Sequence, residues 1–128
     1  MRKMLKVVAM VTLLSGSVHV FAAALNDDMD TLSQGLSMVQ TTTDAVKMKG
    51  ALEDMRIAAL DAQQATPPKL EGQPADSEAM QDYRRGFDIL VSQIDNAIRL
   101  MKEGKTEEAQ KAAGELKVTR DTWHHKYR

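Results

Sequence analysis

The chain has 128 residues, with 17 basic and 18 acidic side chains, a formal net charge of −1 and no cysteine. A slightly acidic balance disfavours binding to nucleic acid or to an anionic membrane surface. The lack of cysteine excludes disulfides, so a domain of this size needs good helix packing or a bound cofactor that adds to its core.

The first 22 residues are typical of a secretory signal peptide. Three basic residues precede a short apolar segment, 7–14, and a small-residue cleavage signature ends at Ala22. The apolar segment is too short to span a membrane. Cleavage after Ala22 leaves one domain, residues 23–128, with 14 basic and 18 acidic residues and therefore a net charge of −4.

Two amphipathic helices are predicted in the first half of this domain. The first covers about residues 25–41, and the second covers about residues 45–63 with Thr43 or Asp44 as its N-cap. Apolar residues recur at steps of three and four in both. The predicted inner positions are Leu25, Met29, Leu32, Leu36 and Val39, then Met48, Leu52, Met55, Ala59 and Ala62.

Two further helices follow a Pro- and Gly-bearing linker, ATPPKLEGQPADS. The third helix begins after Asp76 or Ser77 and ends at Gly104, and the fourth begins after Thr106. Their inner positions are Met80, Tyr83, Phe87, Leu90, Ile94, Ile98 and Met101, then Ala109, Ala112, Leu116, Trp123 and Tyr127. The other connections are short, which favours antiparallel neighbours and an all-α, up-down-up-down four-helix bundle.

This topology gathers the aromatic residues of the mature chain at one end of the bundle. Tyr83 and Phe87 lie near the start of the third helix, and Trp123 and Tyr127 near the end of the fourth. Two adjacent histidines share that end. The pattern favours a site for a flat apolar ligand, although each aromatic residue taken alone is more often a core residue.

Helical phase separates the two histidines. With Leu116 at zero and about 100° per residue, His124 lies at about 80°, on the inner flank, and His125 at about 180°, facing solvent. Met29 lies on an inner flank of the first helix at the same end. An imidazole and a thioether facing one pocket suit haem iron, as in electron-transfer cytochromes. The alternatives are that Met29 fills the core and that His124 is a partly exposed surface residue.

Covalent attachment of haem requires the motif C-x-x-C-H. If His124 were its histidine, the cysteines would stand where this chain has Arg120 and Trp123. Any haem is therefore expected to be non-covalent, a haem b. Arg120 and Arg128, one turn before and one turn after His124, can reach the rim, where propionates need partners.

Four segments carry a family resemblance that extends over the whole mature chain: LNDDMDTL, MRIAALDAQQATPPKLE, RRGFDILVSQIDNAI and HHKYR. They resemble the soluble periplasmic cytochrome b562 family. The resemblance implies Met29 and His124 as axial ligands, arginines at the haem edge, and pocket walls formed by Leu32, Met55, Pro67, Tyr83 and Phe87. The chain departs from the family pattern at Tyr83, Trp123 and Arg85, where the pattern has Phe, Tyr and His.

The resulting prediction is a periplasmic b-type cytochrome that transfers electrons and is not an enzyme. The sequence contains no nucleophile–base pair, phosphate-binding glycine loop or second cluster of metal ligands. We expect a monomer with an unidentified redox partner protein. A haem-free periplasmic adaptor or chaperone is the alternative, and scattered methionines disfavour a copper carrier.

Overall fold

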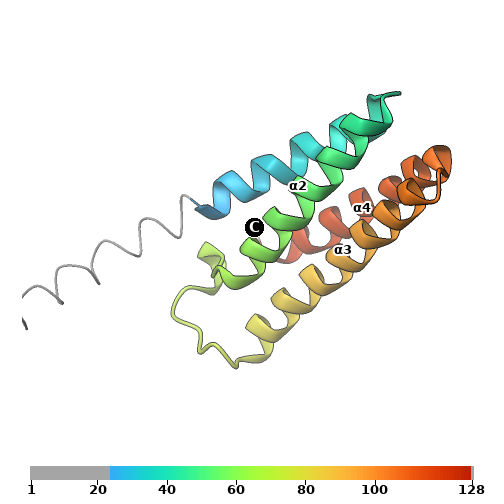
Figure 1. Cartoon of the computed structure of the whole chain (residues 1–128). Helices are drawn as coiled ribbons and strands as arrows, with labels where there is room; N and C mark the ends of the chain where they lie inside the picture. Colours follow the sequence, from blue (N-terminus) through green and yellow to red (C-terminus); the bar gives the residue numbers. More distant parts are fainter. Residues whose placement is uncertain (1–23, 128) are drawn as a thin grey trace, which may run out of the picture.

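Helices account for most of the described chain. The computed structural model describes residues 24–127, so the predicted signal peptide, 1–22, and Arg128 lie outside the described residues. The elements are a helix over residues 24–41, α2 (Ala45–Gln64), the 3-10 helix η1 (Pro68–Leu70), α3 (Glu78–Lys102) and α4 (Thr106–Tyr127). Each long helix runs antiparallel to the next, which confirms the predicted all-α four-helix bundle (Figure 1).

Capping side chains explain where α2 and α3 begin. The Asp44 carboxylate accepts hydrogen bonds from the backbone N–H groups of Val46 and Lys47, at 2.9 and 3.2 Å. The Ser77 hydroxyl accepts one from Met80 N at 3.2 Å. Each bond satisfies an N–H group that has no partner within its helix. Of the residues that the sequence offers as caps, Asp44 rather than Thr43 caps α2 and Ser77 rather than Asp76 caps α3.

Glycine ends α3, as predicted. Gly104 has a φ of 77°, which side-chain-bearing residues rarely adopt, and its N–H donates to Met101 O at 3.0 Å. The long linker is more ordered than its composition suggests, because η1 buries Leu70 against Met80 and Tyr83. This contact fixes the linker against the first turns of α3.

All four helices contribute to one core. The buried cluster includes Val39, Leu52, Ile94 and Leu116, one from each helix. At the end near the 41–45 connection, the Gln110 amide donates to three carbonyls of the first helix and its connection, at 3.0–3.2 Å. On α4 the predicted Ala109 is buried, but the next buried alanine is Ala113, whereas the predicted Ala112 is half-buried, because tertiary packing rotates the stripe slightly from the predicted phase.

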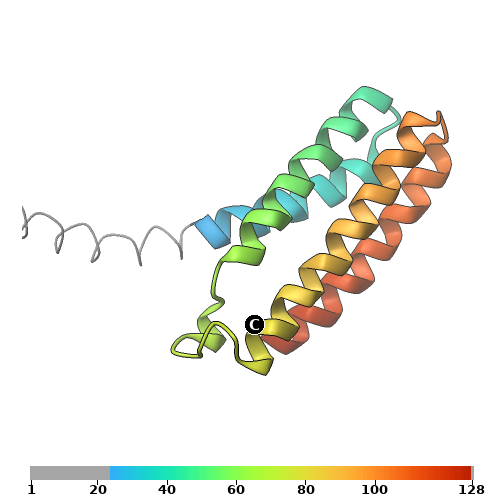
Figure 2. The same cartoon turned by 60° about the horizontal axis from the view of Figure 1, so that its bottom comes forward.

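The bundle is not uniform along its length. In two views, the pair formed by the first helix and α2 diverges from the pair formed by α3 and α4 toward the end where the chain terminates (Figures 1 and 2). The opposite end is closed by small side chains, and Ala97, Ala109 and Ala113 are all at or near 0% exposure. Small side chains allow helix axes to approach closely. The aromatic residues predicted to cluster all belong to the divergent end.

Leu52 tests the importance of the closed part of the core. Its side chain is fully buried, so Leu52→Ala should lower the free energy of unfolding by about 2–5 kcal/mol. Urea denaturation at constant m-value measures this change. Val46→Ala is the matched control on the same helix: Val46 is 82% exposed, and its truncation should change stability by less than about 0.5 kcal/mol. Equal effects of the two substitutions would contradict the described packing of α2.

Candidate functional site

The divergent end of the bundle contains a cavity of about 800 Å³. Ligand and cofactor sites commonly have volumes of about 300–1,000 Å³ and mainly apolar walls with a few polar groups. This cavity has that character. Its walls come from all four long helices and from the segment that follows α2, and they comprise Leu25, Asn26, Met29, Asp30, Leu32, Ser33, Leu36, Met55, Pro67, Pro68, Lys69, Tyr83, Gly86, Phe87, Leu90, Leu116, Thr119, Arg120, Asp121, Trp123, His124 and Tyr127.

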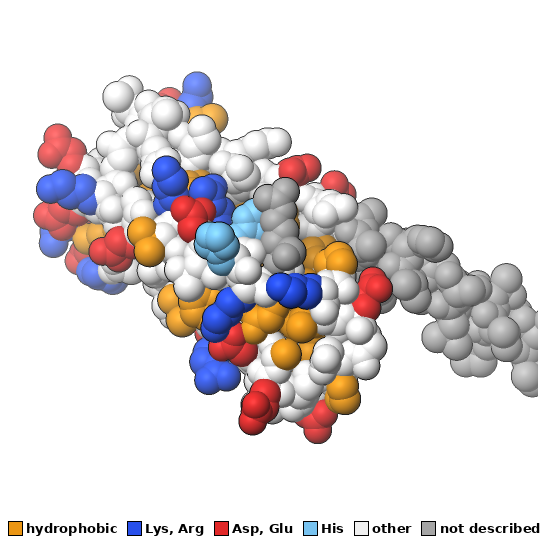
Figure 3. Space-filling view, turned by 180° about the vertical axis from the view of Figure 1, so that it is seen from behind, with side chains coloured by type: hydrophobic (Ala, Val, Ile, Leu, Met, Phe, Trp, Pro, Cys, Tyr) orange, Lys and Arg blue, Asp and Glu red, His pale blue; other side chains and the backbone are white. Residues whose placement is uncertain are grey.

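Nine of the ten residues selected from the sequence border this one cavity. They are Met29, Leu32, Met55, Pro67, Tyr83, Phe87, Arg120, Trp123 and His124. Arg128, the tenth, lies outside the described residues. Both described histidines are exposed and lie together on one face (Figure 3), but only His124 borders the cavity. The histidine that helical phase placed on the inner flank of α4 is thus the one that borders the cavity.

Three aromatic rings form a continuous wall of the cavity. Tyr83 makes edge-to-face contacts with Phe87 and with Tyr127, at ring-centroid distances of 5.0 and 5.7 Å. Its hydroxyl is buried and donates to Ala62 O in the last turn of α2, at 2.7 Å. Burial, with a smaller contribution from the charge of Asp28, raises the pKa of Tyr83. The hydroxyl that departs from the family pattern is thus neutral and satisfied, and it joins α2 to α3.

Trp123 lies directly against the backbone of α3. Its Nε1–H donates to Asp82 O at 3.1 Å. A Cβ atom at Gly86 would overlap Nε1 of the Trp123 ring. Glycine at position 86 is therefore required for this indole to reach α3. The hydrogen bond satisfies the polar end of the indole, while its apolar body borders the cavity.

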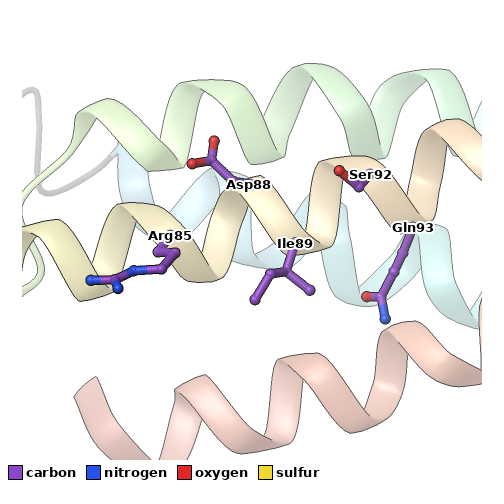
Figure 4. Close-up of a pocket in the computed structure, with 5 residues that line it drawn as sticks. All are labelled: Arg85, Asp88, Ile89, Ser92 and Gln93. Carbon is purple, nitrogen blue, oxygen red and sulfur yellow. The ribbon is translucent and has the colours of Figure 1, made fainter.

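Two arginines at this end of the bundle differ in their position relative to the cavity. Arg120 is half-buried at the rim and pairs with Asp121 at 3.1 Å. Arg85 does not border the cavity. It lines a separate hollow of about 360 Å³ on α3, where Ile89 and Gln93 point toward α4 and Arg85 extends along α3 (Figure 4). The Arg85 side chain is therefore not part of the cavity wall.

Comparisons with known proteins agree with this arrangement. A sequence model of the family described as cytochrome b562 matches residues 24–128. The chain belongs to the cytochrome b562 family. It is 48% identical over 108 residues to a Yersinia pestis protein named probable soluble cytochrome b562 1, and the match covers 84% of this chain and 85% of the relative. A second Y. pestis protein, named probable soluble cytochrome b562 2, is 41% identical over 128 residues, which is 100% of both chains.

Membership of the cytochrome b562 family makes the chain a b-type cytochrome, and proteins of this family are electron carriers rather than enzymes. Within residues 24–127, no cluster of three or more His, Asp or Glu side chains could hold a metal ion. A site made from one thioether and one imidazole is not of that kind. None of the helices over the same residues is long and apolar enough to cross a membrane.

Several wall residues of this cytochrome b562 cavity were not selected from the sequence. Leu25, Leu36, Leu90 and Leu116 were expected in the core but not at a site. Each stands on the same helical stripe as a selected residue, and such positions also fill solid cores. Their role as cavity walls depends on how far the helices diverge, which local periodicity does not encode.

A pair of carboxyl groups lies beside the cavity wall. Oδ2 of Asp28 is buried, and no donor among residues 24–127 reaches it. Burial, followed by a hydrogen bond with Asp61 and the charges of Asp61 and Asp27, raises the pKa of Asp28 to about 7. Below about pH 7 most of the Asp28 carboxyl is protonated, and a protonated carboxyl can donate a hydrogen bond to the neighbouring Asp61.

This pair predicts a pH dependence for the haem-free protein. Because the folded-state pKa of Asp28 lies above the usual 3.8, protonation of Asp28 stabilises the folded state. This contribution to the free energy of unfolding is complete below about pH 4 and is lost as the pH rises through about 7. Urea unfolding should therefore show lower stability at pH 8 than at pH 5, and Asp28→Asn should flatten the dependence. Asp54→Asn, at an exposed position of α2, is the control. A wild-type slope retained in Asp28→Asn would contradict the assignment.

Proposed function

We propose that the chain is a periplasmic electron-transfer protein that binds one non-covalent haem b, with Met29 and His124 as axial ligands to the iron. The observation that carries the proposal is that a thioether and an imidazole, from the first helix and α4, border the same apolar cavity. This donor pair is one of the few that protein side chains offer to haem iron in electron carriers.

The remaining features of the cavity fit this group. Leucines and aromatic rings supply apolar walls, and Arg120 stands at the rim. With no cysteine in the chain, thioether attachment is impossible, so binding depends on the two axial bonds and on burial. We infer that Arg120 and Arg128 pair with the haem propionates, because guanidinium groups bind carboxylates through two parallel hydrogen bonds.

The chain's own residues define the type of reaction. When bound, the haem supplies one-electron chemistry at its iron. Met29 and His124 would hold the iron from the first helix and α4, and with both ligands bound no position would remain for oxygen or a substrate, so the protein would be restricted to outer-sphere electron transfer. The thioether of Met29 would favour the reduced iron and raise the reduction potential. The apolar walls exclude water, and surroundings of low polarity favour the iron state with less charge. This is again the reduced state, so the walls also raise the reduction potential.

The cellular context forms a separate part of the proposal. The N-terminal segment, 1–22, has the composition of a signal peptide cleaved after Ala22, which supports export to the periplasm. A core shared by all four helices supports a monomer. We propose a redox partner protein that docks near the cavity, and the sequence does not favour any one partner.

The histidine assignment can be tested with haemin and the single tryptophan. Trp123 borders the cavity, so one equivalent of haemin should quench its fluorescence and produce a low-spin spectrum with sharp α and β bands on reduction. His124→Ala should abolish the low-spin spectrum, and His125→Ala should leave it nearly unchanged. A flat visible spectrum for the wild type would favour a haem-free adaptor. The reverse behaviour of the two variants would contradict the ligand assignment.

The methionine assignment has its own measurement. Met29→Ala should open an axial position and lower the reduction potential, by about 59 mV for each tenfold loss of preference for the reduced state. Spectroelectrochemical titration measures this change. Met38→Ala is the control on the same helix, because Met38 is 42% exposed and does not border the cavity. An unchanged potential in Met29→Ala would exclude thioether ligation.

A further inference from the structure

The turn of α4 that carries His124 is largely exposed to solvent. In this turn Asp121, Thr122, His124, His125 and Lys126 are all exposed. The last carbonyl groups of a helix have no partners within it, and helix ends that bury few apolar groups open readily. The position of the His124 imidazole therefore depends on contacts between this turn and a neighbouring helix.

One residue of α3 supplies three such contacts. The Asp82 carboxylate accepts a hydrogen bond from Lys126 Nζ at 3.0 Å and a short one from the Tyr127 hydroxyl. Its backbone carbonyl accepts the hydrogen bond from Trp123 Nε1. These bonds, from Tyr127 first and Lys126 second, lower the pKa of Asp82, so the carboxylate is charged and accepts both bonds at neutral pH.

The contacts lie on both sides of His124 along α4. Trp123 precedes it by one residue, and Lys126 and Tyr127 follow it by two and three. Residues three and four apart share a face of a helix, so Trp123, Lys126 and Tyr127 form one face, and Lys126 Nζ also lies 5.3 Å from the centroid of the Trp123 ring. Holding that face against α3 fixes the rotation of the turn, and with it the direction in which His124 points.

Neighbouring residues of α3 also accommodate or bind the last turn of α4. Gly86, one turn after Asp82, leaves the space that the Trp123 ring occupies. Ala79, three residues before Asp82, offers its carbonyl to the Tyr127 hydroxyl at 3.3 Å. The first turns of α3 therefore bind the end of α4 through side-chain charge, backbone carbonyls and close packing together.

We propose that Asp82 is a positioning residue for His124, which holds the last turn of α4 through Trp123, Lys126 and Tyr127 so that the imidazole faces the cavity. The proposal rests on His124 as the haem ligand. In metal sites, residues that orient a ligand commonly contribute about 10- to 100-fold to affinity. We expect Asp82→Ala to weaken haem binding by about that factor, and the oxidised protein to show a high-spin component.

The experiment compares Asp82→Ala with Asp95→Ala. Asp95 is also on α3 and also bonds to another helix, to Arg56 Nε at 2.6 Å, but it lies away from the cavity. Haem dissociation rates and high-spin fractions are measured at a temperature where both variants are folded. Asp82→Asn, which keeps an acceptor oxygen, should recover part of the wild-type behaviour. If Asp82→Ala loses haem no faster than Asp95→Ala, the proposal is overturned.

A second measurement uses the haem-free protein, so its result does not depend on whether His124 is the haem ligand. Amide hydrogen exchange over residues 120–127 should be at least about tenfold faster in Asp82→Ala, while exchange over 109–116 is unchanged. Unchanged exchange over 120–127 would overturn the proposal even if haem binds. If the wild type binds no haem, the proposed function fails, but faster exchange still shows that Asp82 holds this turn. Should Asp82→Ala not fold, Tyr127→Phe removes one of the same bonds, and the same comparison applies.

Discussion

The Tyr83 hydroxyl donates its hydrogen bond to Ala62 O inside the bundle, at the point where α2 and α3 have begun to diverge. Both groups are removed from water there, and leaving either unpaired would cost about 1–3 kcal/mol. The bond therefore favours one particular distance between α2 and α3 at this end of the bundle. The ring that carries the hydroxyl is also the centre of the aromatic wall, between Phe87 and Tyr127, so this separation defines the width of the cavity.

The cavity couples cofactor binding to folding. Its apolar walls make few contacts with one another across about 800 Å³, so they contribute less dispersion energy than a solid core would. A flat apolar cofactor that fills the cavity would supply those contacts. Because the unfolded chain offers no such pocket, binding stabilises the folded state by linkage. The closed end, with its buried alanines, keeps the haem-free bundle together.

Sequence patterns predicted some features of this molecule and not others, for physical reasons. Helix positions followed from the spacing of apolar residues, and the position of His124 rather than His125 beside the cavity followed from helical phase, because both are properties of a single helix. The partners of Asp82 lie 41 to 45 residues away on α4, and no local pattern reports such contacts. The same is true of the raised pKa of Asp28 and of Leu70, which a short 3-10 turn buries within a linker of loop-like composition.

The contact between Gly86 and Trp123 also restricts how the chain can change over time. A methyl group at position 86 would overlap the indole, so no larger residue fits there while tryptophan stands at position 123. A smaller side chain at position 123 removes this conflict and leaves glycine at position 86 tolerable. Substitutions at these two positions can therefore accumulate in only one order. Trp123 on α4 must be replaced before Gly86 on α3 can be replaced.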